Sequence, residues 1–169
     1  EYHSTEFKLN TKNGGFQWYF STFSTIYDEE GNALRVVGLL RNIHAQKVEQ
    51  QKLLIRAETD QMTGLYNKAT TESKIQASLR ELNGNSYEVL MLVDIDDFKK
   101  INDTFGHLKG DDVIIDIAKT LQEYKGDYGI AGRLGGDEFC VFLTNVLDTQ
   151  LACEKAVLIA ERLREIYHD

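Results

Sequence analysis

Two groups of carboxylates in this sequence have the residue types and surroundings of a cation site. The first, Asp94-Ile95-Asp96-Asp97-Phe98, ends the apolar run 89–93, and the second, Gly135-Gly136-Asp137-Glu138-Phe139, forms a glycine turn between two apolar stretches. Mg²⁺ binds few protein carboxylates and keeps its other positions for water and phosphate oxygens. Together the clusters predict a site for hard cations and the phosphates they hold. The alternative is two acidic turns that never meet, since Asp and Gly are common in turns.

Alternating helices and strands have to position these clusters. Apolar runs predict strands over 89–93, 130–133 and 139–143. The first is uniformly apolar, as expected for a central strand covered on both faces. Helical periodicity and the N-cap residue Asp148 predict helices over 70–82, 111–124 and 148–167. This order of elements is typical of an α+β sandwich of the ferredoxin-like kind.

The first 59 residues follow a different pattern. Aromatic and β-branched residues predict three antiparallel strands over 6–10, 16–23 and 34–40, with turns at 12–15 and 28–32. Three such strands are marginal alone, so this segment is expected to need further chain or a partner over its apolar face. Residues 44–59 predict a helix in which Val48 and Ile55 are seven apart. It is either a linker helix that pairs with its twin or a solvated spacer.

Three motifs then follow in order: DQMTGLYNK from Asp60, VLMLVDIDDFKKINDTFGHLKGDD from Val89, and AGRLGGDEFCVFL from Ala131. Their succession resembles the GGDEF domain, the diguanylate cyclase module that condenses two GTP into cyclic di-GMP. The resemblance implies a palm-like nucleotidyl cyclase fold over 60–169. The family continues with another strand and a basic helix, so we expect the domain to be incomplete at its C-terminus. The family's inhibitory Arg-x-x-Asp is absent, because Gly126 and Gly129 stand at its positions.

The segment before the linker resembles the C-terminal part of a PAS sensor domain. The matching residues are Gly15-Phe16-Gln17-Trp18, Asp28-Glu29-Glu30-Gly31, Val37-Gly38 and Arg41-Asn42-Ile43-His44. In the last group, Asn42 and His44 replace the polar members of the family's Asp-Ile-Thr. The expected organisation is therefore a PAS-like part over 1–43, a linker helix over 44–59 and the cyclase domain over 60–169.

The resemblance also implies a metal and catalytic set. Asp94, Asp137, Glu138 and the backbone carbonyl of Ile95 would hold two Mg²⁺ ions per active site, with Mn²⁺ as an alternative. Asp137 would receive the proton of the attacking 3′-hydroxyl, with Glu138 beside it. Lys99 would reach phosphate oxygens, and a solvated lysine is its alternative.

A second implied set binds the substrate. Asn102 and Asp111 match the guanine readers of the family, and a carboxylate suits the N1–H and N2–H₂ donors of guanine. Asp111 is alternatively an N-terminal cap of its helix. His107 and Phe98 complete the substrate-binding set, although His107 is alternatively a neutral packed histidine. Asp96 lies behind the metal ligands if the strand continues past Asp94.

Composition restricts the partners. The chain has 169 residues, 42% of them hydrophobic, and a net charge of −8, which argues against nucleic-acid or anionic-membrane binding. The expected partners are GTP and a second copy of the chain, without direct membrane contact. Cys140 and Cys153 are expected to be buried thiols, which indicates a reducing compartment and hence a cytoplasmic location. The full-length parent protein is either anchored in a membrane or free of it. The competing functions are a GTP- or cyclic di-GMP-binding module without turnover, which regulates a partner or a downstream phosphodiesterase domain, and a pure dimerisation element.

Overall fold

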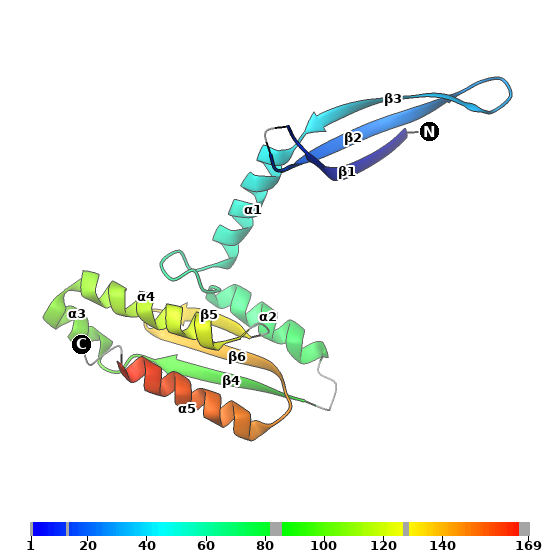
Figure 1. Cartoon of the computed structure of the whole chain (residues 1–169). Helices are drawn as coiled ribbons and strands as arrows, with labels where there is room; N and C mark the ends of the chain where they lie inside the picture. The colour runs from blue at the N-terminus through cyan, green and yellow to red at the C-terminus, as the bar shows by residue number, and fades with distance from the viewer. Residues whose placement is uncertain (1, 13, 82–85, 127–128, 166–169) are drawn as a thin grey trace. The chain divides into compact units, whose positions relative to one another are not determined.

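The computed structural model describes residues 2–12, 14–81, 86–126 and 129–165 and divides into two compact units, Glu1–Ile55 and Arg56–Asp169. The first contains an antiparallel sheet of β1 (Tyr2–Asn10), β2 (Phe16–Tyr27) and β3 (Ala33–Asn42), in that order. These strands include the three predicted ones and are longer at their ends (Figure 1). Helix α1 (His44–Glu58) follows β3, as the sequence predicts.

The junction between β3 and α1 is built from both side-chain and backbone contacts. Asn42 donates from Nδ2 to Oε1 of Gln17 at 2.6 Å, and its Oδ1 accepts the backbone N–H of His44 at 2.9 Å. The N–H of Ile43 donates to the carbonyl of Trp18 at 2.9 Å, and Ile43 is buried. An Asn is therefore able to join the sheet to the first turn of α1, because its amide group both donates and accepts.

The second unit contains an antiparallel sheet with helices on both faces. Along the chain come α2 (Lys68–Glu81), β4 (Tyr87–Asp94), α3 (Phe98–Phe105), α4 (His107–Tyr124), β5 (Ile130–Gly135), β6 (Glu138–Val146) and α5 (Thr149–Glu165), and the strand order is β4-β6-β5. Asp148 caps α5, since its Oδ1 accepts the N–H of Gln150 at 2.8 Å. The predicted end of that helix, Tyr167, lies outside the described residues.

Alternation along β6 divides the core between the two faces of the sheet. Phe139, Val141 and Leu143 pack with Ile117 and Leu121 of α4 and with Ile159 of α5. Helices α4 and α5 lie on one face of this sheet (Figure 1). The other face, which contains the buried Cys140, lies towards α2, where Gly132 of β5 is in close contact with Thr71. This two-faced packing confirms the predicted α+β class.

Three details of the prediction are wrong. Among the described strands β6 is central, while β4 is at an edge and leaves Leu92 71% exposed. An apolar run does not by itself tell a strand's place in a sheet. Cys153 is exposed, because Ala152 and Ile159 carry the buried face of α5. Helix α3 was not expected, although Phe98 and Ile101 have helical spacing and both pack on the core.

None of the helices among the described residues combines the length and apolar character needed to cross a membrane.

Candidate functional site

The pairing of β4 with β6 brings the two acidic clusters together. Asp94, the last residue of β4, lies directly opposite Glu138, the first residue of β6. Side chains of directly opposed residues share one face of a sheet, with Cβ atoms about 4.5–5.5 Å apart. Two like charges there are unfavourable unless a cation lies between them. The register thus places the carboxylates of Asp94 and Glu138 side by side, and a bound cation would offset their repulsion.

The glycine turn next to this pair is a two-residue hairpin loop. Gly135 pairs with Glu138, so Gly136 and Asp137 are the central residues. Gly136 has φ +48°, which is costly for a residue with a Cβ and is required at the first central position of a type II′ turn. Asp137 therefore lies one residue from the Asp94–Glu138 pair.

The residues present fit a divalent cation. The carbonyl of Ile95 accepts one turn hydrogen bond, from Phe98 N at 3.3 Å, and a carbonyl oxygen has a second lone pair. In the described part of the chain, no three Asp, Glu, His or Cys side chains form a ready cluster for a metal ion. Mg²⁺ does not require one, because one or two carboxylates suffice when waters and phosphates complete its octahedron.

Packing of α3 against α4 brings the two expected guanine readers to one place. A Cβ on Gly110 would lie 2.0 Å from Oδ1 of Asn102, so a side chain at this position would displace that amide. Asp111 follows Gly110 and is half-buried, as is Asn102. Helix α4 begins at His107, four residues before the predicted start, so Asp111 is not an N-cap. The capping alternative is therefore wrong.

The remaining predicted residues differ in their exposure to solvent. Lys99 is exposed on the first turn of α3, and His107 is exposed at the start of α4, which contradicts a packed histidine. Phe98 packs partly against the core. Strand β4 ends at Asp94, so Asp96 is not on a continued strand and is exposed beyond the buried Ile95.

Two residues in or next to the acidic clusters were given no role from the sequence. Asp97 precedes α3 with φ 56° and ψ 27°, a left-handed conformation that is uncommon for a residue other than glycine. Arg133 of β5 donates from Nε and Nη2 to the carbonyl of Gly136 at 3.0 and 2.7 Å. No local sequence pattern predicts a role for Arg133, because its acceptors are the carbonyl of Gly136 and the carboxylate of the distant Asp60.

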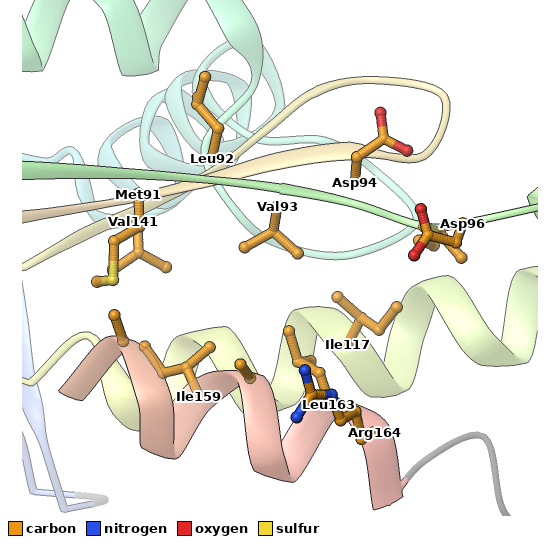
Figure 2. Close-up of a pocket in the computed structure, with 13 residues that line it drawn as sticks. Met91, Leu92, Val93, Asp94, Asp96, Ile117, Val141, Ile159, Leu163 and Arg164 are labelled. Atoms are coloured by element: carbon orange, nitrogen blue, oxygen red, sulfur yellow. The ribbon is translucent and has the colours of Figure 1, made fainter. Parts of the chain in front are cut away.

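A cavity of about 630 Å³ lies between β4 and α5 and is mainly apolar. Figure 2 shows Met91 and Val93 pointing towards α5, whereas Asp94 points to the opposite side of the strand. The lining also includes Asp94, Asp96 and Arg164, although the carboxylate of Asp94 points away from α5.

Comparisons with known proteins place these observations in a family. The model for the diguanylate cyclase GGDEF domain matches residues 57–168. The diguanylate cyclase DgcN of Escherichia coli strain K12 is 42% identical over 100 residues, which cover 59% of this chain and 24% of that protein. The chain thus spans about a quarter of the length of that relative.

Solved structures agree in fold. The coiled coil and GGDEF domain of DgcB from Caulobacter crescentus, in complex with c-di-GMP, gives a TM-score of 0.63 at 25% identity, covering 69% of this chain and 61% of that one. A sensory box/GGDEF family protein from Caulobacter crescentus CB15 gives 0.54 at 36% identity, covering 64% of this chain and 69% of that one.

Proposed function

Because this chain belongs to the GGDEF family of diguanylate cyclase domains, we propose that it condenses two GTP into cyclic di-GMP and releases two pyrophosphates. The observation that carries this proposal is the register that sets Asp94 opposite Glu138, with Asp137 in the adjoining turn. All three carboxylates are present, so a binding module without turnover is the less favoured function.

Asp94, Asp137, Glu138 and the carbonyl of Ile95 are the groups that would hold two Mg²⁺ ions, with Mn²⁺ able to replace them. When bound, such ions neutralise phosphate charge and acidify a bound hydroxyl. Asp137 accepts the proton of the attacking 3′-hydroxyl. Lys99 is exposed on the first turn of α3 and supplies a positive charge to the phosphate oxygens.

Asn102 and Asp111 select guanine. The Asp111 carboxylate accepts from N1–H and N2–H₂, and the Asn102 amide meets the remaining edge. Adenine would leave the carboxylate unpaired, and polar sites discriminate strongly against such a ligand. Phe98 and His107 line this part of the site.

The reaction needs two copies of the chain. Each 3′-hydroxyl attacks the α-phosphate of the other GTP, so one bound GTP cannot close the two-fold product. Helix α1 supports pairing, because it has no buried residue among those described and exposes Leu54 and Ile55. We assign α1 to a paired linker helix and β1–β3 to the C-terminal part of a PAS-like sensor.

The test is incubation of the chain with GTP and Mg²⁺, with products identified by chromatography and mass spectrometry. We expect cyclic di-GMP and pyrophosphate in a 1:2 ratio, a specific activity that rises with chain concentration, and no product with EDTA. Absence of cyclic di-GMP at concentrations where the chain is dimeric would overturn the proposed function.

A further inference from the structure

Arg133 joins the glycine turn to a segment far away in sequence. Its side chain is only 12% exposed. While Nε and Nη2 donate to the carbonyl of Gly136, Nη1 donates to Oδ1 of Asp60 at 3.1 Å. The planar guanidinium fixes the angle between these directions, so the two acceptors are held in one geometry.

Asp60 is itself firmly held. Its Oδ1 also accepts the backbone N–H of Thr63 at 2.9 Å and the Thr63 hydroxyl at 2.7 Å, and its own N–H donates to the carbonyl of Leu65 at 2.8 Å. Burial raises the pKa of this carboxyl, but the hydrogen bonds from Thr63 and Arg133 outweigh burial and lower it overall. Asp60 is therefore an ionised anchor for Arg133 at neutral pH.

The segment that contains Asp60 is fastened to the end of α1. Nδ2 of Asn67 donates to the carbonyl of Ala57 at 2.7 Å, and the N–H of Asn67 donates to the carbonyl of Glu58 at 2.9 Å. The segment is also fastened to β5, where the N–H of Arg133 donates to the carbonyl of Tyr66 at 2.9 Å. Hydrogen bonds of one segment therefore join the last turn of α1 to the anchor of Arg133.

The atom that Arg133 holds determines the position of Asp137. The carbonyl of Gly136 and the N–H of Asp137 belong to one planar peptide group, so fixing the oxygen fixes the direction of that N–H. Gly136 has a positive φ and would otherwise sample many conformations. A misplacement of about 1 Å at a reacting group costs on the order of a hundredfold in rate.

We propose that Arg133 is a positioning residue that holds the Gly136–Asp137 turn in its reactive geometry and couples that turn, through Asp60, to the end of α1. The catalytic consequence rests on the proposed cyclase function, whereas the ordering of the turn does not. The two are therefore measured separately.

The test variant is Arg133→Lys, which keeps the charge but has no planar fork for two acceptors. Its matched control is Arg162→Lys, since Arg162 donates to the Tyr124 hydroxyl and to Glu165, and neither partner belongs to the turn or to the segment of Asp60. Backbone ¹⁵N relaxation on the whole chain reports the order parameter of the Asp137 amide. We expect a rigid value near 0.85 in the wild type and the control, and a value below about 0.6 in Arg133→Lys.

The kinetic readout separates positioning from a general loss of structure. We expect the kcat for cyclic di-GMP in Arg133→Lys to fall about ten- to a hundredfold, with KM for GTP within about threefold. The melting temperatures of Arg133→Lys and Arg162→Lys should agree. An Asp137 amide as rigid in Arg133→Lys as in the control would overturn the proposal, as would an unchanged kcat.

Asp60→Ala provides the second test, since it removes the anchor and leaves the contacts to Gly136. The order parameter of the Asp137 amide must fall in this variant also; an unchanged value contradicts the coupling, even if Arg133→Lys does not fold. If the wild-type chain makes no cyclic di-GMP, the proposed function fails while the relaxation data still decide whether Arg133 orders the turn.

Discussion

Among the described residues, two acidic, glycine-containing turns close hairpins, one in each unit, and only one of these two has the surroundings of an active site. In the turn between β2 and β3, Oδ1 of Asp28 accepts the N–H of Asn32 at 2.8 Å and that of Glu30 at 3.0 Å. Its carboxylate is thus occupied by its own turn. In the turn between β5 and β6, Glu138 instead lies opposite the carboxylate of Asp94.

The difference arises from the neighbouring strand. Strand β1 pairs with β2 only as far as Ser24, so no described residue of β1 lies across from Asp28. Strand β4 reaches the end of β6 and finishes there in an acidic residue. Similar turn composition therefore has different consequences, because the register of a third strand decides whether a carboxylate stabilises a turn or contributes to a site.

The largest expected effect separates the two turns by activity. Asp137→Ala should reduce cyclic di-GMP synthesis by at least about a thousandfold, since it removes both a cation ligand and the proton acceptor. Asp28→Ala, the matched control, should leave turnover within about twofold because its partners are local. Both rates are measured at saturating GTP and Mg²⁺. If Asp137→Ala were nearly as active as the wild type, the turn between β5 and β6 would have no greater part in catalysis than the turn between β2 and β3.

The two sheets should differ in stability as the two turns differ in chemistry. Leu143 of β6 is 4% exposed, whereas Leu39 of β3 is 78% exposed. Leu143→Ala should lower the free energy of unfolding of its unit by about 2–5 kcal/mol. Leu39→Ala should change the free energy of unfolding of the first unit by less than about 0.5 kcal/mol. Urea unfolding followed by amide signals of each unit gives both values, and equal losses would mean that β3 is covered in solution.

The guanine site offers a matched pair of neighbouring carboxylates. Asp111→Ala should lower the preference for GTP over ATP by at least about tenfold, because no unpaired carboxylate then penalises adenine. Asp112 is exposed, so Asp112→Ala should leave that preference unchanged. The ratio of kcat/KM for the two nucleotides provides the measurement. The same ratio in both variants would leave Asp111 without a role in selectivity.

The stretch that leads into β5 should not bind product tightly. Gly126 has φ +70°, and a Cβ at Gly129 would lie 2.1 Å from the carbonyl oxygen of Lys125, so neither position suits the longer residues of Arg-x-x-Asp. Asp127, the nearest carboxylate in sequence, lies outside the described residues. Calorimetry with cyclic di-GMP, after a non-reacting GTP analogue fills the active site, should give a Kd weaker than about 1 µM. Tighter binding would show a product site elsewhere on the chain.

The smallest effect is the acid response of the first turn. The N–H of Asn32 is the main cause of a lowered pKa for Asp28, opposed by partial desolvation. A lowered pKa in the folded state stabilises this turn above the ordinary aspartate pKa, and that stabilisation is lost as pH falls through the lowered value. A ¹³C titration should find the Asp28 carboxyl titrating below the usual range near pH 3.9. Titration at the usual value would mean that the turn does not hold it.

Sequence predicted the strands of both sheets well because apolar and β-branched runs are local signals. It predicted the start of α4 poorly. The predicted helix begins at residue 111, whereas α4 begins at His107 and includes Gly110, where an added Cβ would displace the Asn102 amide. The acidic clusters were found from composition, but the pairing of Asp94 with Glu138, and the role of Arg133, depend on which strands become neighbours. Those are tertiary properties that no local pattern carries.

We propose that the turn between β5 and β6, and not the turn between β2 and β3, forms the cation site. Paramagnetic Mn²⁺ tests it most directly when titrated into ¹⁵N-labelled chain in the presence of a non-reacting GTP analogue. We predict that amide signals of Asp94, Ile95, Asp137 and Glu138 broaden first, while those of Asp28 and Glu30 remain sharp. Broadening at Asp28 and Glu30 with no effect at Asp137 would contradict the account.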